Sequence, residues 1–348
     1  MRKFIIPFFL ILVFIYPLNS FELKEVLTIG SEKPHYEFFL ITNVEVDEGG
    51  NIYIVDGKAC ALKKYSPQGK YIVGVGKCEQ GPEDFGRRSS IVPKIRGSLL
   101  YVYDFVNKRI NLFDENLKHL KILKFKGKSF YRFFFIVDSL FYGPIFIAEN
   151  GSDRIYVYDM NMNKKFSFFR EYPDYVNTRK KEAFYKGVSS FYSSLLMDYN
   201  NEKGIFAITF FYPSKKTIVY FYDKNGKFVN KQFFVIMNHY RFPRFLLSYP
   251  PKYPKSYENI RITSLNFYKN KYLVLAYKIE KFSGKKYLGE KAYILLINID
   301  KAKIIEKKEI SPGFRILNIK GNYLYAKNFD DDIEKLHVYK IEGIEWEN

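Results

Sequence analysis

The sequence has few of the residues that usually mark a catalytic centre or a metal site. It contains one Trp, two Cys and four His in 348 residues. The histidines lie far apart, with no two at ligand spacing, at positions His35, His119, His239 and His337. A Gly-x-Ser-x-Gly nucleophile motif and a phosphate-binding loop are also missing. We therefore expect no catalytic residue, no metal site and no cofactor.

Aromatic and basic residues, in contrast, are abundant. Phe, Tyr and Trp make up 19% of the chain, with 35 Phe and 31 Tyr, and these residues favour strands. The formal net charge of +19 favours an acidic partner such as an anionic glycan, lipid headgroups or nucleic acid. A lysine-rich solvated surface would explain the same charge without any partner.

The first twenty residues are typical of a secretory signal peptide. Arg2 and Lys3 precede an apolar run from Phe4 to Tyr16, which is shorter than a membrane-spanning helix. We expect a signal peptide at residues 1–20, a single domain at 21–348, and a secreted, periplasmic or cell-envelope location. Leu18 is not the small residue expected at the cleavage spacing, so an uncleaved signal anchor is an alternative. Such an anchor is the only contact with a membrane that we expect. A buried first strand or helix is another.

The stretch from Val44 to Val75, VEVDEGGNIYIVDGKACALKKYSPQGKYIVGV, predicts four short antiparallel strands separated by turns. Such a small sheet cannot bury both faces alone, and similar stretches follow it. IYIVD, ending at Asp56, aligns with LYVYD, ending at Asp104. The expected later strands are 131–138, 144–148, 154–159 and 164–170 in the third copy, then 191–198, 204–211, 217–223 and 227–236, then 260–268, 272–279, 291–299 and 303–310, and finally 314–319, 322–327 and 335–341.

Six copies predict an all-β fold, a six-bladed β-propeller of four-stranded antiparallel blades. The sixth copy lacks a clear fourth strand. Glu22–Gly30 has no neighbouring hairpin partner and is expected to supply that strand, which would close the ring. Gly343–Glu347, with the single Trp346, is the alternative. A β-sandwich or two separate β domains are the competing architectures.

Cys60 and Cys78 are expected to form a disulfide. In an exported protein such a pair is often oxidised. Cys60 lies at the turn between the second and third strands of the first blade, and Cys78 lies just after its fourth strand. Those connections share one end of a blade, so a bond is geometrically allowed, with two buried thiols as the alternative.

Residues 40–125 resemble the NHL-repeat six-bladed propellers. The similar residues are Asp47, Gly50–Ile54, Asp56 and Leu62–Lys70, followed by GVGKCEQGPEDF at Gly74–Phe85. Glu83 stands where that family usually has Gly, and Cys78 is an addition. The resemblance implies the fold. It does not imply one function, because the family includes protein binders, RNA binders, sensor domains, lyases and lactonases.

Strand-end carboxylates offer one route to catalysis. Asp47, Asp138 and Asp198 end first strands, and a metal-dependent lactonase or lyase would need such groups to converge on the channel. Hairpin turns also favour Asp, so we interpret these residues as turn caps. The same interpretation covers Asp56, Asp104, Asp114, Asp159 and Asp223. His119 and His337 lie within strand or strand-edge patterns and are expected at the surface.

The long connections between blades offer a binding face. Gly76–Ser89, Glu171–Ser190 and Met237–Asn259 each join a fourth strand to the next first strand, so all three should emerge on one face of the disc. The third connection interleaves aromatic and basic residues, which are common in interfaces. Our candidate ligand-binding residues are Arg241, Arg244, Tyr249, Tyr240, Arg87 and Arg88. A lid that packs over the blade ends is the alternative.

These observations predict an exported, non-catalytic binding module that holds a protein or an anionic polymer at the cell envelope. The first alternative is the metal-dependent lactonase or lyase. The second is a protein that binds single-stranded RNA, but nucleic acid is not expected as a partner of an exported chain.

Overall fold

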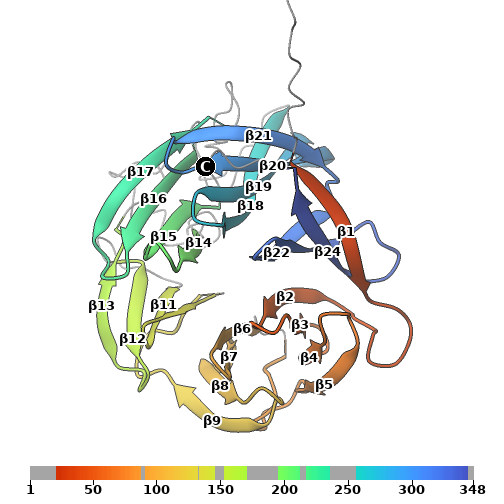
Figure 1. Cartoon of the computed structure of the whole chain (residues 1–348), viewed down its shortest axis with the longest axis vertical. Coiled ribbons are helices and arrows are strands. Elements are labelled where there is room, and N and C mark those ends of the chain that lie inside the picture. The colour runs from red at the N-terminus through yellow and green to blue at the C-terminus, as the bar shows by residue number, and fades with distance from the viewer. Residues whose placement is uncertain are drawn as a thin grey trace, which may run out of the picture.

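The computed structural model describes residues 21–87, 91–131, 133–145, 153–170, 195–211, 217–235 and 256–343. Six four-stranded antiparallel sheets are arranged in a ring about a common centre (Figure 1). The predicted six-bladed propeller is therefore confirmed. None of the described residues belongs to a helix long and apolar enough to cross a membrane. The predicted signal peptide at residues 1–20 lies outside the described part of the chain.

Blades 1 to 5 run in sequence order from an inner strand to an outer strand, and blade 6 does so except that its outermost strand is the first strand of the chain. Blade 1 contains β2 (Ile41–Val46), β3 (Ile52–Asp56), β4 (Ala61–Tyr65) and β5 (Tyr71–Val75). Blade 2 contains β6 (Ile91–Arg96), β7 (Leu99–Asp104), β8 (Arg109–Phe113) and β9 (His119–Lys124). Blade 3 contains β10 (Phe135–Val137), β11 (Leu140–Pro144), β12 (Ile155–Asp159) and β13 (Lys164–Phe168).

The other three blades follow the same plan. Blade 4 contains β14 (Leu195–Asn200), β15 (Ile205–Phe210), β16 (Thr217–Asp223) and β17 (Phe228–Phe234). Blade 5 contains β18 (Tyr257–Tyr268), β19 (Tyr272–Ser283), β20 (Lys286–Asn298) and β21 (Lys303–Ile310). Blade 6 contains β22 (Phe314–Lys320), β23 (Tyr323–Asn328), β24 (Leu336–Glu342) and, outermost, β1 (Glu22–Ile29).

The two ends of the chain close the ring in blade 6. Strand β1 pairs with β24 in antiparallel register, from Glu22 opposite Glu342 to Ile29 opposite Leu336. This pairing confirms that the first predicted strand, rather than residues after 342, supplies the fourth strand of the last blade. Closure also protects strand edges that an open array would expose.

The hydrophobic core lies between neighbouring blades. One cluster joins Tyr53 and Val55 of blade 1 to Ile91 and Leu100 of blade 2, and all four side chains are buried. Another cluster packs the β1 residue Ile29 against inner residues of blade 1. Each blade thus buries its apolar faces against its neighbours, which is the reason for the repeat.

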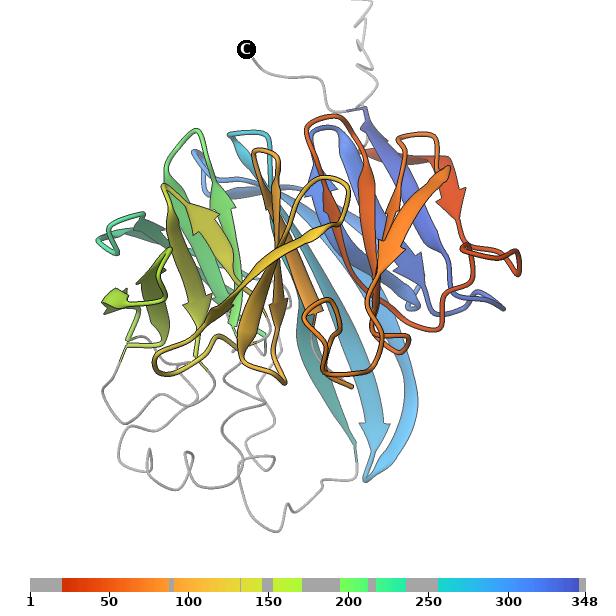
Figure 2. The same ribbon diagram turned by 90° about the horizontal axis from the view of Figure 1, so that it is seen from below.

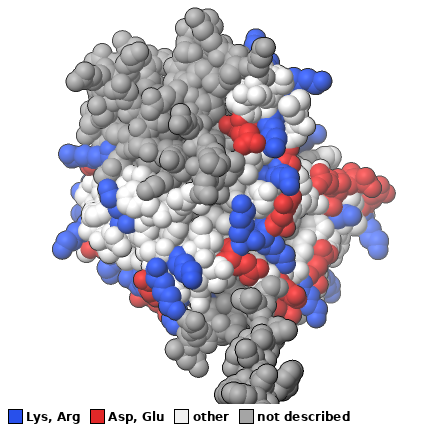
Figure 3. All heavy atoms as spheres, turned by 90° about the horizontal axis from the view of Figure 1, so that it is seen from above, with Lys and Arg blue, Asp and Glu red and all other residues white. Residues whose placement is uncertain are grey.

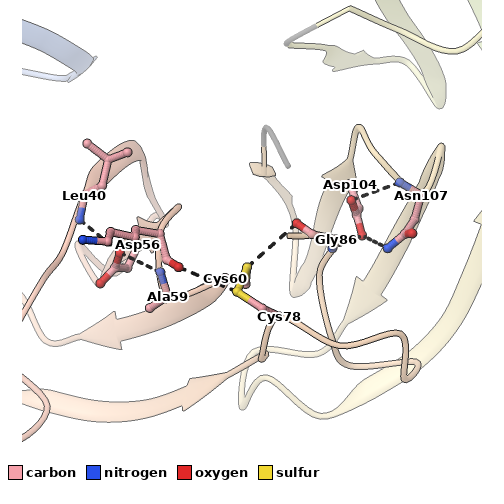
Figure 4. The surroundings of a disulfide bond; sticks show 9 residues. Leu40, Asp56, Ala59, Cys60, Cys78, Gly86, Asp104 and Asn107 are labelled. Atoms are coloured by element: carbon pink, nitrogen blue, oxygen red, sulfur yellow. Dashed lines mark hydrogen bonds between the residues drawn. A yellow bond between two sulfur atoms is a disulfide. The ribbon is translucent and has the colours of Figure 1, made fainter. Parts of the chain in front are cut away.

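Two aspartates at the ends of second strands fix the entry of the chain into blades 1 and 2. Asp56 is fully buried and accepts hydrogen bonds from the backbone N–H groups of Phe39, Leu40 and Ala59, at 2.9, 3.1 and 3.2 Å. Asp104, also fully buried, accepts from the Gly86 N–H at 3.0 Å and from Asn107 (Figure 4). Their role is to satisfy backbone donors at strand ends.

Other predicted turn aspartates have the expected role. Asp114 Oδ1 accepts from the N–H groups two and four residues later, at 2.9 and 2.8 Å. Asp159 and Asp223 make the same pair of bonds in blades 3 and 4. Asp47 caps its turn through Asn51. Asp138 instead forms an exposed ion pair with Lys224.

The predicted disulfide is present. Cys60 and Cys78 are bonded with an S–S distance of 2.09 Å, and their Cα atoms are 5.1 Å apart. The bond ties the turn between β3 and β4 to the segment that follows β5 (Figure 4). It therefore fastens the middle hairpin of blade 1 to the connection that leads into blade 2.

The second strand of blade 3 differs from the prediction. It runs from Leu140 to Pro144 and not from Pro144 to Ala148. A tight turn at Asp138 and Ser139, both with positive φ, reverses the chain earlier than expected. Asp138 suits such a turn, but Ser139 stands where Gly is usual.

Blade 5 is longer than predicted. Residues 257–259 extend its inner strand, and residues 280–283 and 286–290 extend the next two. The predicted strands at 272–279 and 291–299 left residues 280–290 between them as a connection. A turn at Gly284, which has a φ of 58°, instead continues the hairpin.

Candidate functional site

A cavity of about 550 Å³, which we call the channel mouth, lies near the centre of the ring at the end where the inner strands begin. Its walls include the first residues of β2, β14 and β22, near Thr42, Leu196 and Arg315. Strand β18 contributes residues 263–266, because its first residues project beyond the ring. The volume falls within the range of small-molecule sites.

Three buried oxygen atoms in this cavity's walls have no hydrogen-bond partner within the described part of the chain. They are Thr42 Oγ1, Ser264 Oγ and Asn266 Oδ1. Ser264 is only 7% exposed. A buried polar group without a partner costs about 1–3 kcal/mol. Three such groups around one cavity indicate that a polar ligand or ordered water completes their hydrogen bonding.

Aromatic rings from blades 2, 3 and 4 complete the walls. Phe105 meets Tyr131 edge to face, with ring centroids 5.9 Å apart. Phe133 makes a similar contact with Phe135 at 6.0 Å. The Arg261 guanidinium lies over the ring of Phe211, with its Cζ atom 5.7 Å from the ring centroid. Because these rings are fixed by contacts with one another, they form a rigid surface. The flat apolar face of a ligand can pack against it.

Three charged residues lie on the inner strands next to these wall residues. Lys94 Nζ on β6 is 2.8 Å from Glu45 Oε2 on β2. Burial alone would lower the pKa of Lys94, but the Glu45 carboxylate outweighs it and raises that pKa. The pair brings a matched positive and negative charge to the interior of the ring.

Asp198 on β14 is the third of these charged residues on the inner strands. Its Oδ2 accepts a hydrogen bond of 2.6 Å from the backbone N–H of Phe267 on β18. Burial raises the pKa of Asp198 to about 6, although the Phe267 bond and the Lys94 charge act in the opposite direction. The prediction that Asp198 caps a turn is therefore wrong, because this carboxylate joins blade 4 to blade 5.

Histidine positions also differ from the prediction. His337 is not a surface residue. Its ring lies between Glu25 at 3.2 Å and Asp331 at 2.7 Å, and only 12% of the side chain is exposed. His119 is half-buried against Phe113. No group of three His, Cys, Asp or Glu residues that could hold a metal ion occurs among the residues the structure describes.

Most of the predicted binding residues lie outside the described residues. These are Tyr240, Arg241, Arg244, Tyr249 and Arg88. Arg87 is described and exposed, but it is not part of the cavity walls. The connection that carries it is held by buried Phe85 and by Arg109, which donates to the Gly81 and Asp84 carbonyl oxygens at 2.8 and 2.7 Å.

Sequence reasoning missed the cavity because its wall residues are far apart in the chain. Thr42, Ser264 and Arg315 come from three blades, and no local motif joins them. The only hint of the cavity in the sequence is weaker than a local motif. TSLN at 263–266 places three polar residues within an inner strand, where apolar residues are otherwise frequent.

Comparisons with known proteins indicate the fold and no closer relationship. No protein-family model matches the sequence, and no curated protein matches it. A solved member of the DUF4221 family from Bacteroides vulgatus is 12% identical, with a TM-score of 0.58 over 94% of this chain and 100% of that one. A "putative exported protein" from Bacteroides fragilis is 10% identical, with a TM-score of 0.56 over 94% and 96%.

An enzyme appears among the similar structures as well. The PQQ-bound aldose sugar dehydrogenase from Streptomyces coelicolor is 9% identical, with a TM-score of 0.52 over 93% of this chain and 99% of that one. At such low sequence identity, structural similarity indicates a shared fold but not a shared activity. The chain is an all-β six-bladed propeller whose first and last strands share a blade.

Proposed function

We propose that this chain is an exported, non-catalytic binding module that holds an acidic saccharide of the cell envelope in its channel mouth. The observation that carries the proposal is the set of three unpartnered oxygens of Thr42, Ser264 and Asn266 around one cavity. These atoms have almost no solvent-accessible surface, so sugar hydroxyls can donate to them once the side chains rotate toward the cavity. The neighbouring rings suit the apolar face of a sugar, which packs on aromatic side chains.

Charge favours an acidic sugar over a neutral one. Arg315 is an exposed cavity residue, and guanidinium groups bind carboxylate and sulfate oxygens in two parallel bonds. The net charge of +19 would attract such a ligand from a distance. Figure 3 shows basic side chains spread over the described part of one edge of the ring, with acidic ones among them. The sequence-based prediction that Arg241 and Arg244 bind the ligand stays a prediction, because both lie outside the described residues.

Three observations support export. The first twenty residues have the pattern of a signal peptide. The Cys60–Cys78 disulfide suits an oxidising compartment. One structural neighbour is described as an exported protein. The resemblance of blades 1 and 2 to NHL repeats fits a binding role, which several members of that family have.

Titration calorimetry with uronic-acid oligosaccharides and their neutral counterparts tests the proposal. Ser264→Val removes one hydrogen-bonding oxygen and should weaken binding about tenfold. Arg315→Ala should weaken binding of the acidic sugar and leave that of the neutral one unchanged. Arg96→Ala is the matched control, because Arg96 is an exposed arginine at the opposite end of an inner strand.

Equal binding by wild type and both cavity variants would contradict the proposal, as would no binding of any acidic saccharide. The alternative from the sequence, a metal-dependent lactonase or lyase, predicts a tightly held divalent ion. Metal analysis of the purified protein together with lactone hydrolysis assays distinguishes that function from binding.

A further inference from the structure

Blade 5 projects beyond the ring on the side of the channel mouth. Its first three strands have 12, 12 and 13 residues, against 6, 5 and 5 in blade 1. Strand β21 pairs with β20 only from Ala292 to Asn298, so the preceding part of β20 extends past it. About six additional residues per strand correspond to roughly 20 Å. Figure 2 shows these long strands reaching below the neighbouring blades.

The tip of this projection is basic and apolar. We call residues 281–289, KFSGKKYLG, the hairpin tip; it contains three Lys and no Asp or Glu. Leu288 is 58% exposed and Tyr287 is 50% exposed. Lys285 and Lys286 are exposed beside them, and Lys281 lies 3.3 Å from Glu258. The tip therefore presents two large apolar side chains next to positive charge.

An aromatic row supports the tip from behind. The ring of Phe282 stacks on Tyr257 with centroids 4.9 Å apart and an interplanar angle of 7°. Tyr287 meets the same Phe282 ring edge to face at 5.7 Å. Tyrosines with an apolar ring and a polar hydroxyl are enriched where proteins meet the headgroup layer of a bilayer.

Acidic residues at the base of the projection are already paired. Glu280 lies 3.1 Å from Arg261, and Glu290 lies 2.7 Å from Lys278. The Glu280 and Glu290 side chains are largely buried in these pairs. Glu280 and Glu290 are therefore balanced locally, as Glu258 is by Lys281, and the remaining formal charges at the end of blade 5, those of Lys285 and Lys286, are positive.

We propose that the hairpin tip contacts the surface of an anionic lipid bilayer. Leu288 and Tyr287 enter the headgroup layer, and Lys285 and Lys286 lie among the lipid phosphates, as long lysine side chains do at such interfaces. The lysine content favours lipid over protein, since Lys is depleted from the cores of protein interfaces. This contact is independent of the saccharide site, although both lie at the same end of the ring.

Cosedimentation with vesicles tests the proposal. The protein is the chain from Phe21 onward, which contains every strand of the ring and omits the apolar segment before it. Vesicles of phosphatidylcholine alone are compared with vesicles that also contain phosphatidylglycerol. Wild type should bind the anionic vesicles at least about tenfold more tightly than the neutral ones, and added salt should weaken that binding.

Two double variants locate the contact. Lys285→Glu with Lys286→Glu should reduce binding to the level seen with neutral vesicles. Tyr287→Ser with Leu288→Ser should weaken it several-fold. The matched control is Phe228→Ser with Val229→Ser on β17, where the side chains are 48% and 52% exposed, and it should bind as wild type does.

A direct readout of insertion completes the test. In Leu288→Trp, tryptophan emission should shift to shorter wavelength on anionic vesicles, while the single native Trp346 provides the background in wild type. Wild-type binding by both tip variants would overturn the proposal. Loss of binding in the β17 control alone, or binding to soluble acidic polymers with none to vesicles, would do so as well.

Discussion

Blades 1 and 5 have the same order of strands but differ in what surrounds those strands. Blade 1 is short and closely fastened, with a buried Asp56, a disulfide and 5-residue outer strands. Blade 5 is long, contains neither cysteine, and supplies both Ser264 in the channel mouth and the exposed hairpin tip. We therefore propose that blade 1 contributes mainly to stability and that blade 5 contributes the contacts with ligands.

The largest expected effect comes from removing the blade 1 aspartate. Asp56→Ala leaves three backbone N–H groups without their charged acceptor. We expect the free energy of unfolding to fall by about 3–4 kcal/mol, measured by urea denaturation. The matched control is Asp114→Ala, which removes an aspartate with two bonds in an exposed turn and should cost about 1 kcal/mol.

Equal losses in the two variants would show that burial of the carboxylate is not what matters in blade 1. Comparable destabilisation by substitutions in the hairpin tip, such as Leu288→Ser, would break the proposed division between the two blades.

The disulfide should have the second-largest effect. Replacing both cysteines in Cys60→Ala with Cys78→Ala removes a cross-link across 18 positions, and we expect a loss of about 2–3 kcal/mol. Reductant should destabilise wild type by a similar amount and leave the double variant unaffected. A wild-type denaturation midpoint that does not respond to reductant would contradict the assignment.

The smallest effect concerns the contact between blades 4 and 5. The pKa of Asp198 in the folded protein is about 6, above its ordinary value of 3.8. Between these two pH values the folded protein holds a proton that the unfolded chain has lost, so stability decreases as pH rises and then levels off. Below pH 3.8 both states are protonated and the difference disappears.

Asp198→Asn keeps the acceptor for the Phe267 N–H and removes the titration. The stability of wild type relative to this variant should therefore fall by about 2 kcal/mol between about pH 4 and pH 7. Denaturation midpoints across that range provide the measurement. Parallel pH profiles of the two proteins would show that Asp198 is ionised throughout.

Much of the ring was predictable because each blade carries its own local information. Turn residues around Asp47, Asp114 and Asp223 set the hairpins, and alternating apolar residues set the faces. Ring closure was predictable from the number of strands in each blade. Strand β1 had no hairpin partner nearby in the sequence, and blade 6 lacked a fourth strand. The positions of Cys60 and Cys78 in blade 1 made their bond predictable too.

The channel mouth and the projection were not predictable for physical reasons. Thr42, Ser264 and Arg315 come together only when the ring closes, so no stretch of sequence shows them as a group. The hairpin tip resembles a loop in sequence, because its charges are those of an exposed turn. Asp198 resembles any strand-end aspartate until the adjacent blade brings the Phe267 N–H to it.

A crystal structure of the protein with a uronic-acid disaccharide tests the central claim most directly. The account predicts sugar density in the channel mouth, with hydroxyl groups within hydrogen-bond distance of Ser264 Oγ and Asn266 Oδ1 and a carboxylate at Arg315. Sugar bound elsewhere on the protein, with water alone in the channel mouth, would contradict it.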